Sequence, residues 1–182
     1  MPLLIHLNGP AGVGKSTLAR RYADEHPGSL NLEADTVVSL IGGWERDFFA
    51  SLAPARNLAV AMATAHLRAG HDVVLPQLVT DVDEAKQLED AARSADAAHV
   101  EVAMLATGEE QNSRFRGRSQ DDQVHRHVAL AVDAMGGDDL LRKIDEDFTR
   151  YLSDRPKALR LDSSGVPSAV AYTRLLSLLH AG

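Results

Sequence analysis

The sequence predicts an α/β fold in which helices cover both faces of a doubly wound parallel β-sheet. Two observations favour it. Short apolar runs alternate with longer helical segments along the chain, and a glycine-rich stretch joins the first run to the first helix. The chain has 182 residues and no linker-like segment divides it. We therefore expect a single domain over residues 1–182, with its ligands at the carboxyl ends of the strands.

Five short runs are expected to form the strands of this sheet. Apolar side chains dominate them, as is typical of strands that are covered by helices on both faces. Turn-forming or helical segments bound each run, so that consecutive strands are joined by helical crossovers. The expected strands cover residues 3–7, 30–33, 72–75, 99–105 and 157–161.

Seven segments are expected to be helical. Pro27 and Gly28 end the first of them and Gly70 ends the second, because proline and glycine interrupt a helix. Asp81 and Asp138 are expected to be N-caps, since a carboxylate accepts hydrogen bonds from the amides of the first helical turn. The expected helices cover residues 15–26, 46–69, 81–95, 109–118, 123–134, 138–153 and 167–180.

Residues 9–17 carry the strongest functional signal in the chain. Their sequence, Gly-Pro-Ala-Gly-Val-Gly-Lys-Ser-Thr, matches the pattern G-x-x-x-x-G-K-[ST]. An expected strand precedes it and an expected helix follows, which is the context in which this pattern forms a phosphate-binding P-loop. The residues predicted to bind nucleotide are Gly9, Ala11, Gly12, Val13, Gly14, Lys15, Ser16 and Thr17.

The residue types of this motif suit a nucleoside triphosphate with Mg²⁺. Glycine tolerates positive φ angles, so the loop backbone can turn its amides toward phosphate oxygens. The helix that follows adds the partial positive charge of its N-terminus. Lys15 is predicted to reach the β- and γ-phosphates, and the Ser16 hydroxyl is predicted to bind Mg²⁺. ATP and Mg²⁺ are therefore the expected cofactors.

Asp35 is the predicted catalytic base. It follows the second expected strand, whose carboxyl end should lie at the same edge of the sheet as the P-loop. A carboxylate there could accept the proton of a substrate hydroxyl or hold Mg²⁺ through water. The alternative is that Asp35 only caps a helix over residues 36–40. Glu33 is the second candidate for the base.

An arginine cluster follows the fourth expected strand. Arg114 and Arg118 lie four residues apart and so share one face of a helix. Guanidinium groups suit the charge that develops on a transferred phosphoryl group, so both arginines are predicted to be catalytic. The segment at about 112–127 is then expected to be a helical lid that closes over the nucleotide. The alternative is a solvated helix whose arginines pair with Asp121 and Asp122.

Composition narrows the classes of function. The formal net charge is −7 with no basic tail, which argues against nucleic acid as a partner. No apolar run approaches the length of a membrane span, and Met1 to Leu3 lead directly into the first strand with no room for a signal peptide. There is no cysteine, so disulfides and cysteine-ligated metals are excluded. The expected location is the cytoplasm.

These residues together resemble the small P-loop kinases. That group includes chloramphenicol phosphotransferase, zeta-toxin-like kinases, the tunicamycin-resistance protein, and shikimate and gluconate kinases. The matching segments are residues 9–17, Asp35 and the run Arg114-Phe115-Arg116-Gly117-Arg118. The resemblance implies a P-loop NTPase fold, a three-layer α/β/α sandwich with a five-stranded sheet of order 2-3-1-4-5. It also implies transfer of the γ-phosphoryl group of ATP to a hydroxyl of a small molecule such as an antibiotic, nucleoside or sugar.

Other functions remain open from the sequence. One is a nucleotide-binding regulatory NTPase with a protein partner. Others are a nucleoside or nucleotide kinase and a zeta-toxin-like kinase of nucleotide sugars. Pro76-Gln77 follows the third expected strand, where many P-loop enzymes carry an acid for Mg²⁺, and the next acids are Asp81 and Asp83. This difference argues against a motor-type ATPase. The acceptor and the oligomeric state are not specified by the sequence.

Overall fold

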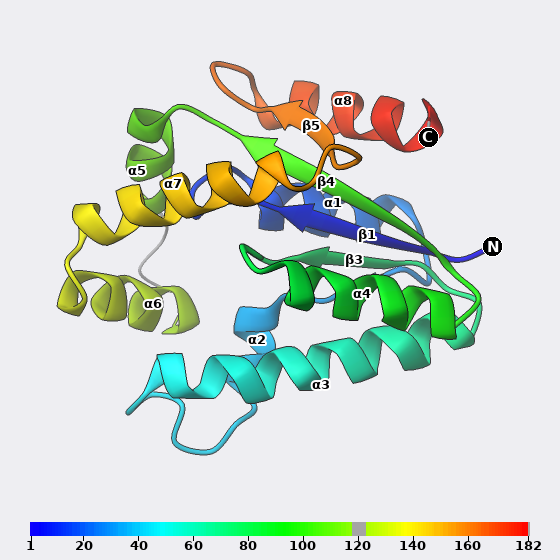
Figure 1. Ribbon diagram of the computed structural model, residues 1–182, viewed down its shortest axis with the longest axis horizontal. Helices are drawn as coiled ribbons and strands as arrows, with labels where there is room; N and C mark the ends of the chain where they lie inside the picture. Colours follow the sequence, from blue (N-terminus) through cyan, green and yellow to red (C-terminus); the bar gives the residue numbers. More distant parts are fainter. Residues whose placement is uncertain (118–122, 182) are drawn as a thin grey trace.

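A five-stranded parallel sheet forms the centre of the molecule (Figure 1). The computed structural model describes residues 1–117 and 123–181. The strand order is β2-β3-β1-β4-β5, which confirms the order implied by the resemblance to P-loop kinases. The strands are β1 (Leu3–Asn8), β2 (Leu30–Asn31), β3 (Val73–Pro76), β4 (Ala98–Leu105) and β5 (Leu159–Asp162).

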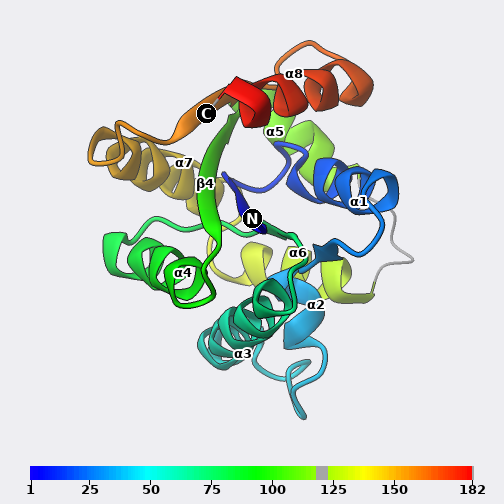
Figure 2. The same cartoon turned by 90° about the vertical axis from the view of Figure 1, so that its right-hand side faces the viewer.

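Helices cover both faces of the sheet (Figure 2), so the predicted three-layer α/β/α arrangement is confirmed. Helices α1 and α8 pack on one face, while α3, α4 and α7 pack on the other. The described helices are α1 (Lys15–Glu25), α2 (Ala34–Val38), α3 (Phe48–Arg68), α4 (Val82–Ser94), α5 (Gly108–Arg116), α6 (Gln123–Ala134), α7 (Asp138–Ser153) and α8 (Ser168–Ala181).

Alternation along the central strands builds two apolar cores. In β1, Leu4 packs with the α3, α4 and α7 layer, whereas Ile5 and Leu7 pack with α1 and α8. Successive side chains of a strand point to opposite faces, so a single strand supplies both cores. β1 pairs with β3 on one side and with β4 on the other, which places it in the middle of the sheet. The residue after β1, Gly9, therefore emerges from the centre of the sheet edge.

Several predicted boundaries differ from those observed. β2 ends at Asn31 rather than at residue 33, because only Leu30 and Asn31 pair with β3. Asp138 is the first residue of α7 and its N-cap is Gly137, so the prediction that Asp138 is the cap was wrong. The prediction for Asp81 is confirmed, since its side chain accepts a hydrogen bond from the amide of Glu84.

Helices α5 and α6 lie beyond the carboxyl ends of the strands, on the same side as the loop that follows β1 (Figure 1). The segment predicted to be the lid, at about 112–127, includes the end of α5 and the start of α6. Arg118, Asp121 and Asp122 lie outside the described residues, so the predicted roles of these three side chains stay predictions. Within the part of the chain that is described, no helix combines the length and the apolar character needed to cross a bilayer.

His6 is fully buried in the interior of the sheet, and it should make stability depend on pH. Burial lowers the pKa of His6 from 6.5 to about 4, although Glu101 acts in the opposite direction. Between these values the unfolded chain binds a proton that the folded chain does not. Stability is therefore complete above pH 6.5 and is lost as the pH falls toward 4.

We expect His6→Gln to remove part of this pH dependence. The wild type should lose about 2 kcal/mol of unfolding free energy through His6 between pH 7 and pH 5, and the variant should lose correspondingly less. Urea denaturation at the two pH values measures the difference. His180→Gln is the control, because His180 is exposed near the end of α8 and should keep the wild-type pH dependence. Equal losses in all three proteins would contradict the prediction.

Candidate active site

The loop after β1 is shaped by glycines that no other residue could replace. Gly12 has a φ angle of 83°, and a Cβ atom added to it would lie 2.1 Å from the backbone oxygen of Gln111. A Cβ atom on Gly9 would lie 2.6 Å from the backbone oxygen of Met104. The loop backbone is thus pressed against β4 and α5, and it folds into a narrow turn at the sheet edge.

The N-terminus of α1 opens at the end of this turn. Gly14 is the N-cap in a left-handed conformation with a φ angle of 95°, and no side chain caps the helix there. The first amides of a helix have no intrahelical acceptors, so they are available to an anion. The Lys15 ammonium donates hydrogen bonds to the carbonyl oxygens of Gly9 and Pro10, at 2.6 and 2.7 Å, and so lies over the loop. This arrangement suits phosphate groups.

Ser16 and Thr17 occupy the first turn of α1. Ser16 is half-buried and Thr17 is exposed. In P-loop proteins, the hydroxyl residue directly after the lysine binds the metal ion that accompanies the phosphates. Ser16 occupies this position. No cluster of three or more histidine or acidic side chains that could hold a metal occurs among the described residues. The Ser16 hydroxyl suits Mg²⁺ that is also bound by phosphate oxygens of a nucleotide.

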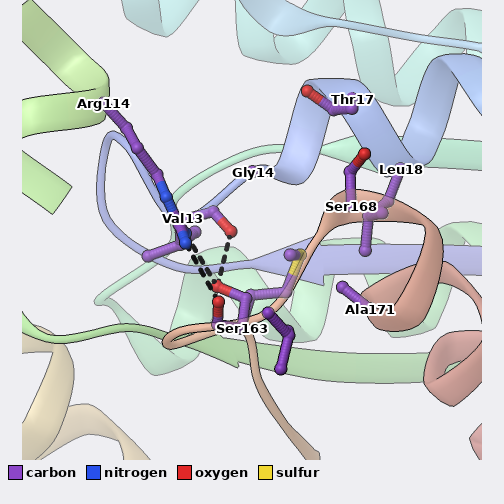
Figure 3. Close-up of a pocket in the computed structure, with 10 residues that line it drawn as sticks. Val13, Gly14, Thr17, Leu18, Arg114, Ser163, Ser168 and Ala171 are labelled. Carbon is purple, nitrogen blue, oxygen red and sulfur yellow. Dashed lines mark hydrogen bonds between the residues drawn. The ribbon is translucent and has the colours of Figure 1, made fainter. Parts of the chain in front are cut away.

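A cavity of about 160 Å³ adjoins the loop and α1 (Figure 3). Most of its wall is apolar, with a few hydroxyl groups at the rim, a composition that suits a flat, weakly polar group. The wall joins the P-loop to the end of β4, the segment after β5 and the start of α8. The lining residues are Val13, Gly14, Thr17, Leu18, Met104, Arg114, Ser163, Val166, Ser168 and Ala171.

Arg114 reaches this cavity from α5 and binds the segment after β5 (Figure 3). Its guanidinium donates to the Oγ and to the backbone oxygen of Ser163, at 3.2 and 3.1 Å. The Ser163 Oγ lies 3.1 Å from the carbonyl oxygen of Val13 in the P-loop. Glu110 accepts a bond from Arg114 at 3.4 Å and another from the amide of Gly165 at 2.8 Å. Arg114 is thus tied to the side of the site that holds the cavity.

Arg116 faces away from Arg114, as their spacing predicts. It donates to Asp133 at 2.6 Å and to Asp138 at 3.2 Å, so it joins α5 to α6 and α7. These carboxylates hold the pKa of Arg116 above its ordinary value. Arg116 lies within the predicted lid segment and therefore links α5 to α6 and α7 through exposed ion pairs.

Asp35 lies in the first turn of α2 and is exposed. The helix begins at Ala34 with Glu33 as its N-cap, so the alternative that Asp35 caps a helix over residues 36–40 was wrong. The chain leaves the sheet after Asn31, earlier than expected, and turns into α2 at once. Glu33, the second candidate for the base, is half-buried and lies 3.9 Å from Arg20.

The edge after β3 carries an acid that the sequence analysis did not identify. The Gln77 side chain donates to Glu84 of α4 at 2.7 Å, and Arg56 of α3 donates to the same carboxylate at 2.9 Å. Burial raises the pKa of Glu84, and Arg56 only partly opposes it. Asp81 caps α4 instead. Glu84 lies seven residues after Gln77, and no pattern in the local sequence predicts that their side chains meet.

Another acid, which is buried, lies inside the sheet. Glu101 of β4 accepts hydrogen bonds from Asn8 at 2.8 Å, Tyr151 at 2.7 Å and Arg155 at 3.0 Å. Burial alone would raise the pKa of Glu101, but these donors and His6 hold it below its ordinary value. Polar residues inside otherwise apolar strand patterns, such as Asn8 and Glu101, are the signal that could have indicated this network.

Comparison with known proteins agrees with this geometry. Residues 4–135, most of the chain, match the protein family described as the AAA domain, AAA_33. The chain belongs to this family. The matched residues include the P-loop, β4 and the start of the segment that follows it, α5. They end before α7, so α7, β5, the segment after β5 and α8 lie outside the match. No curated protein matches the sequence.

Several solved structures share the fold of this AAA domain protein at low sequence identity. A candidate kinase of Chloroflexus aurantiacus aligns with a TM-score of 0.65 at 16% identity, over 100% of this chain and 97% of the other. The tunicamycin resistance protein of Deinococcus radiodurans gives 0.59 at 14% identity, over 99% and 96%. A gluconokinase of Sinorhizobium meliloti gives 0.58 at 16%, over 98% and 96%. At these identities the likeness establishes the kinase-like P-loop fold.

Gly12→Ala should abolish nucleotide binding. The added methyl group would meet the Gln111 backbone, and the φ angle of 83° would itself be strained, so the loop must change shape. Thermal unfolding with and without ATP and Mg²⁺ measures the loss, because a ligand raises the melting temperature only if it binds the folded protein. Gly43→Ala is the matched control, since Gly43 has a φ angle of 84° but open space around it. An ATP-induced shift of wild-type size in Gly12→Ala would contradict the prediction.

Proposed function

We propose that this protein is an ATP- and Mg²⁺-dependent phosphotransferase that acts on a hydroxyl group of a small molecule. The observation that carries the proposal is the phosphate cradle of residues 9–17, with Lys15 over the loop and a mostly apolar cavity beside it. A triphosphate suits the cradle and a nucleoside suits the cavity. The kinase-like fold and the AAA domain family agree with this assignment.

Within this proposal each part of the loop has a task. The loop amides and the N-terminus of α1 bind the β- and γ-phosphates, and Lys15 adds a full positive charge. Ser16 holds Mg²⁺ together with phosphate oxygens. When bound, the metal neutralises charge on the phosphates. Ala11, Val13 and Thr17 contribute backbone or side-chain contacts around the same groups.

The acceptor side of the proposed site lies beyond α2. Asp35 is exposed there and would orient the acceptor hydroxyl and take its proton. Arg114 and Arg118 would stabilise the transferred phosphoryl group when the segment 112–127 closes as a lid. For Arg114 this requires that its guanidinium leave Ser163. The likeness to a gluconokinase supports a small molecule as the acceptor class.

A panel of acceptors tests the proposal directly. ADP release is measured with antibiotics, nucleosides, sugars and nucleotide sugars, and Lys15→Ala is expected to lower the rate by about 100-fold or more because a charge aimed at the transition state is lost. Lys157→Ala is the control, since Lys157 is exposed and follows α7. Tight ATP binding without acceptor-dependent ADP release would favour a regulatory NTPase instead. Activity confined to nucleotide sugars would favour a zeta-toxin-like kinase.

Asp35→Asn should separate chemistry from nucleotide binding. The amide keeps the shape of the side chain but cannot take a proton, so we expect kcat to fall by roughly 100-fold or more while the affinity for ATP stays close to that of the wild type. Calorimetry with ATP and steady-state kinetics with the acceptor from the panel measure the two quantities. Glu33→Gln is the comparison. If Glu33→Gln lost activity and Asp35→Asn kept it, the base would be Glu33.

A further inference from the structure

The ladder between β1 and β3 continues beyond its last backbone pair through a side chain. Regular pairing ends at Leu7 and Pro76, and the amide of Gln77 still donates to the carbonyl of Leu7 at 3.2 Å. The next contact is made by the carboxamide of Asn8. Its Oδ1 accepts from the amide of Val79 at 2.8 Å, and its Nδ2 donates to the carbonyl of Val79 at 3.0 Å. A carboxamide has the donor and acceptor of a peptide group, so Asn8 adds one rung to the sheet.

This rung lies beneath the P-loop. Asn8 directly precedes Gly9, the first residue of the loop, and both Asn8 and Val79 are fully buried. Val79 belongs to the segment 77–81 between β3 and α4, which also carries Gln77 and so contacts Glu84. Asn8 thus joins the strand that carries the phosphate cradle to a neighbouring segment of the same sheet edge. No regular strand pairing reaches that far.

The orientation of Asn8 is itself fixed. The second hydrogen of Nδ2 is donated to Glu101, whose carboxylate also accepts from Tyr151 of α7 and from Arg155. The two hydrogens of the amide nitrogen therefore have two separate acceptors, and the oxygen faces the amide of Val79. A reversed carboxamide would place its oxygen against the Glu101 carboxylate and the Val79 carbonyl. The network therefore holds Asn8 in one rotamer.

We propose that Asn8 is a positioning residue that couples the P-loop to the segment 77–81, so that nucleotide bound at the loop also orders the edge after β3. The proposal rests on the proposed nucleotide function. Removing the carboxamide leaves the Val79 amide and carbonyl, and one acceptor oxygen of Glu101, buried without these partners. Gln77 keeps its hydrogen bonds to Leu7 and His6, but the rest of the segment 77–81 should then move independently of the loop.

Hydrogen–deuterium exchange followed by mass spectrometry tests this coupling. The wild type, Asn8→Ala and Tyr22→Phe are compared with and without adenylyl-imidodiphosphate and Mg²⁺. Tyr22→Phe is the matched control, because it also removes a hydrogen bond to a carboxylate, from Tyr22 to Asp72 at 3.0 Å, but near the opposite end of the sheet. Peptides that cover the P-loop and the segment 77–81 are followed separately.

In the wild type and in Tyr22→Phe, the nucleotide should slow exchange in both peptides, by about tenfold or more at saturation. In Asn8→Ala it should still protect the P-loop but should no longer protect the segment 77–81. Protection of both peptides in Asn8→Ala would overturn the proposal, as would loss of the coupling in Tyr22→Phe. A mere loss of stability would raise exchange in all states without separating the two peptides.

Two further comparisons keep the test decisive. Asn8→Asp retains the oxygen that faces the Val79 amide but places a second oxygen against the Val79 carbonyl and Glu101, so it should also uncouple the peptides. If Asn8→Ala does not fold, Asn8→Asp decides. If the nucleotide leaves the wild-type P-loop unprotected, the proposed nucleotide function fails. The contact between Asn8 and the segment 77–81 is then tested in the proteins without nucleotide. Faster exchange over 77–81 in Asn8→Ala than in Tyr22→Phe supports the positioning role of Asn8, and equal exchange in the two variants overturns it.

Discussion

The close approach of two glycines to neighbouring backbone is the constraint on which the rest of the site depends. Gly9 lies against Met104 at the end of β4, and Gly12 lies against Gln111 in α5. These contacts hold the loop after β1 against β4 and α5, where Val13 and Gly14 of the loop line the cavity. Because neither position has room for a Cβ atom, the loop can turn its amides inward while staying packed at its outer side. The position of α1, and with it Lys15, follows from this turn.

The two faces of the sheet serve different purposes at this edge. The cavity belongs to the face covered by α1 and α8, where Leu18, Met104 and Ala171 form part of the apolar core. The face covered by α3, α4 and α7 carries, beside its own apolar core, the buried polar side chains of His6, Asn8 and Glu101. Strand alternation separates the two environments, since Met104 and Glu101 lie on opposite sides of β4.

Burying charged groups so close to the P-loop is costly unless hydrogen bonds compensate for it. Glu101 receives three donors, and Arg155 also contacts Glu89, so the network holds few unpaired groups. The exceptions among the described side chains include one nitrogen each of His6 and His99. Burial keeps the pKa values of both histidines below the ordinary value, which disfavours their charged forms.

Local signals in the chain were sufficient for the P-loop, for the alternation of strands and helices and for several helix boundaries, such as those of α6 and α7. These features depend on residues a few positions apart, and the family resemblance added the strand order. The contacts of Arg114 with Ser163, of Gln77 with Glu84 and of Asn8 with Val79 followed only from packing. Spacing along the chain does not encode which side chains meet once helices cross the sheet. For the same reason the start of α2 was misplaced, because the short pairing of β2 with β3 determines where the chain leaves the sheet.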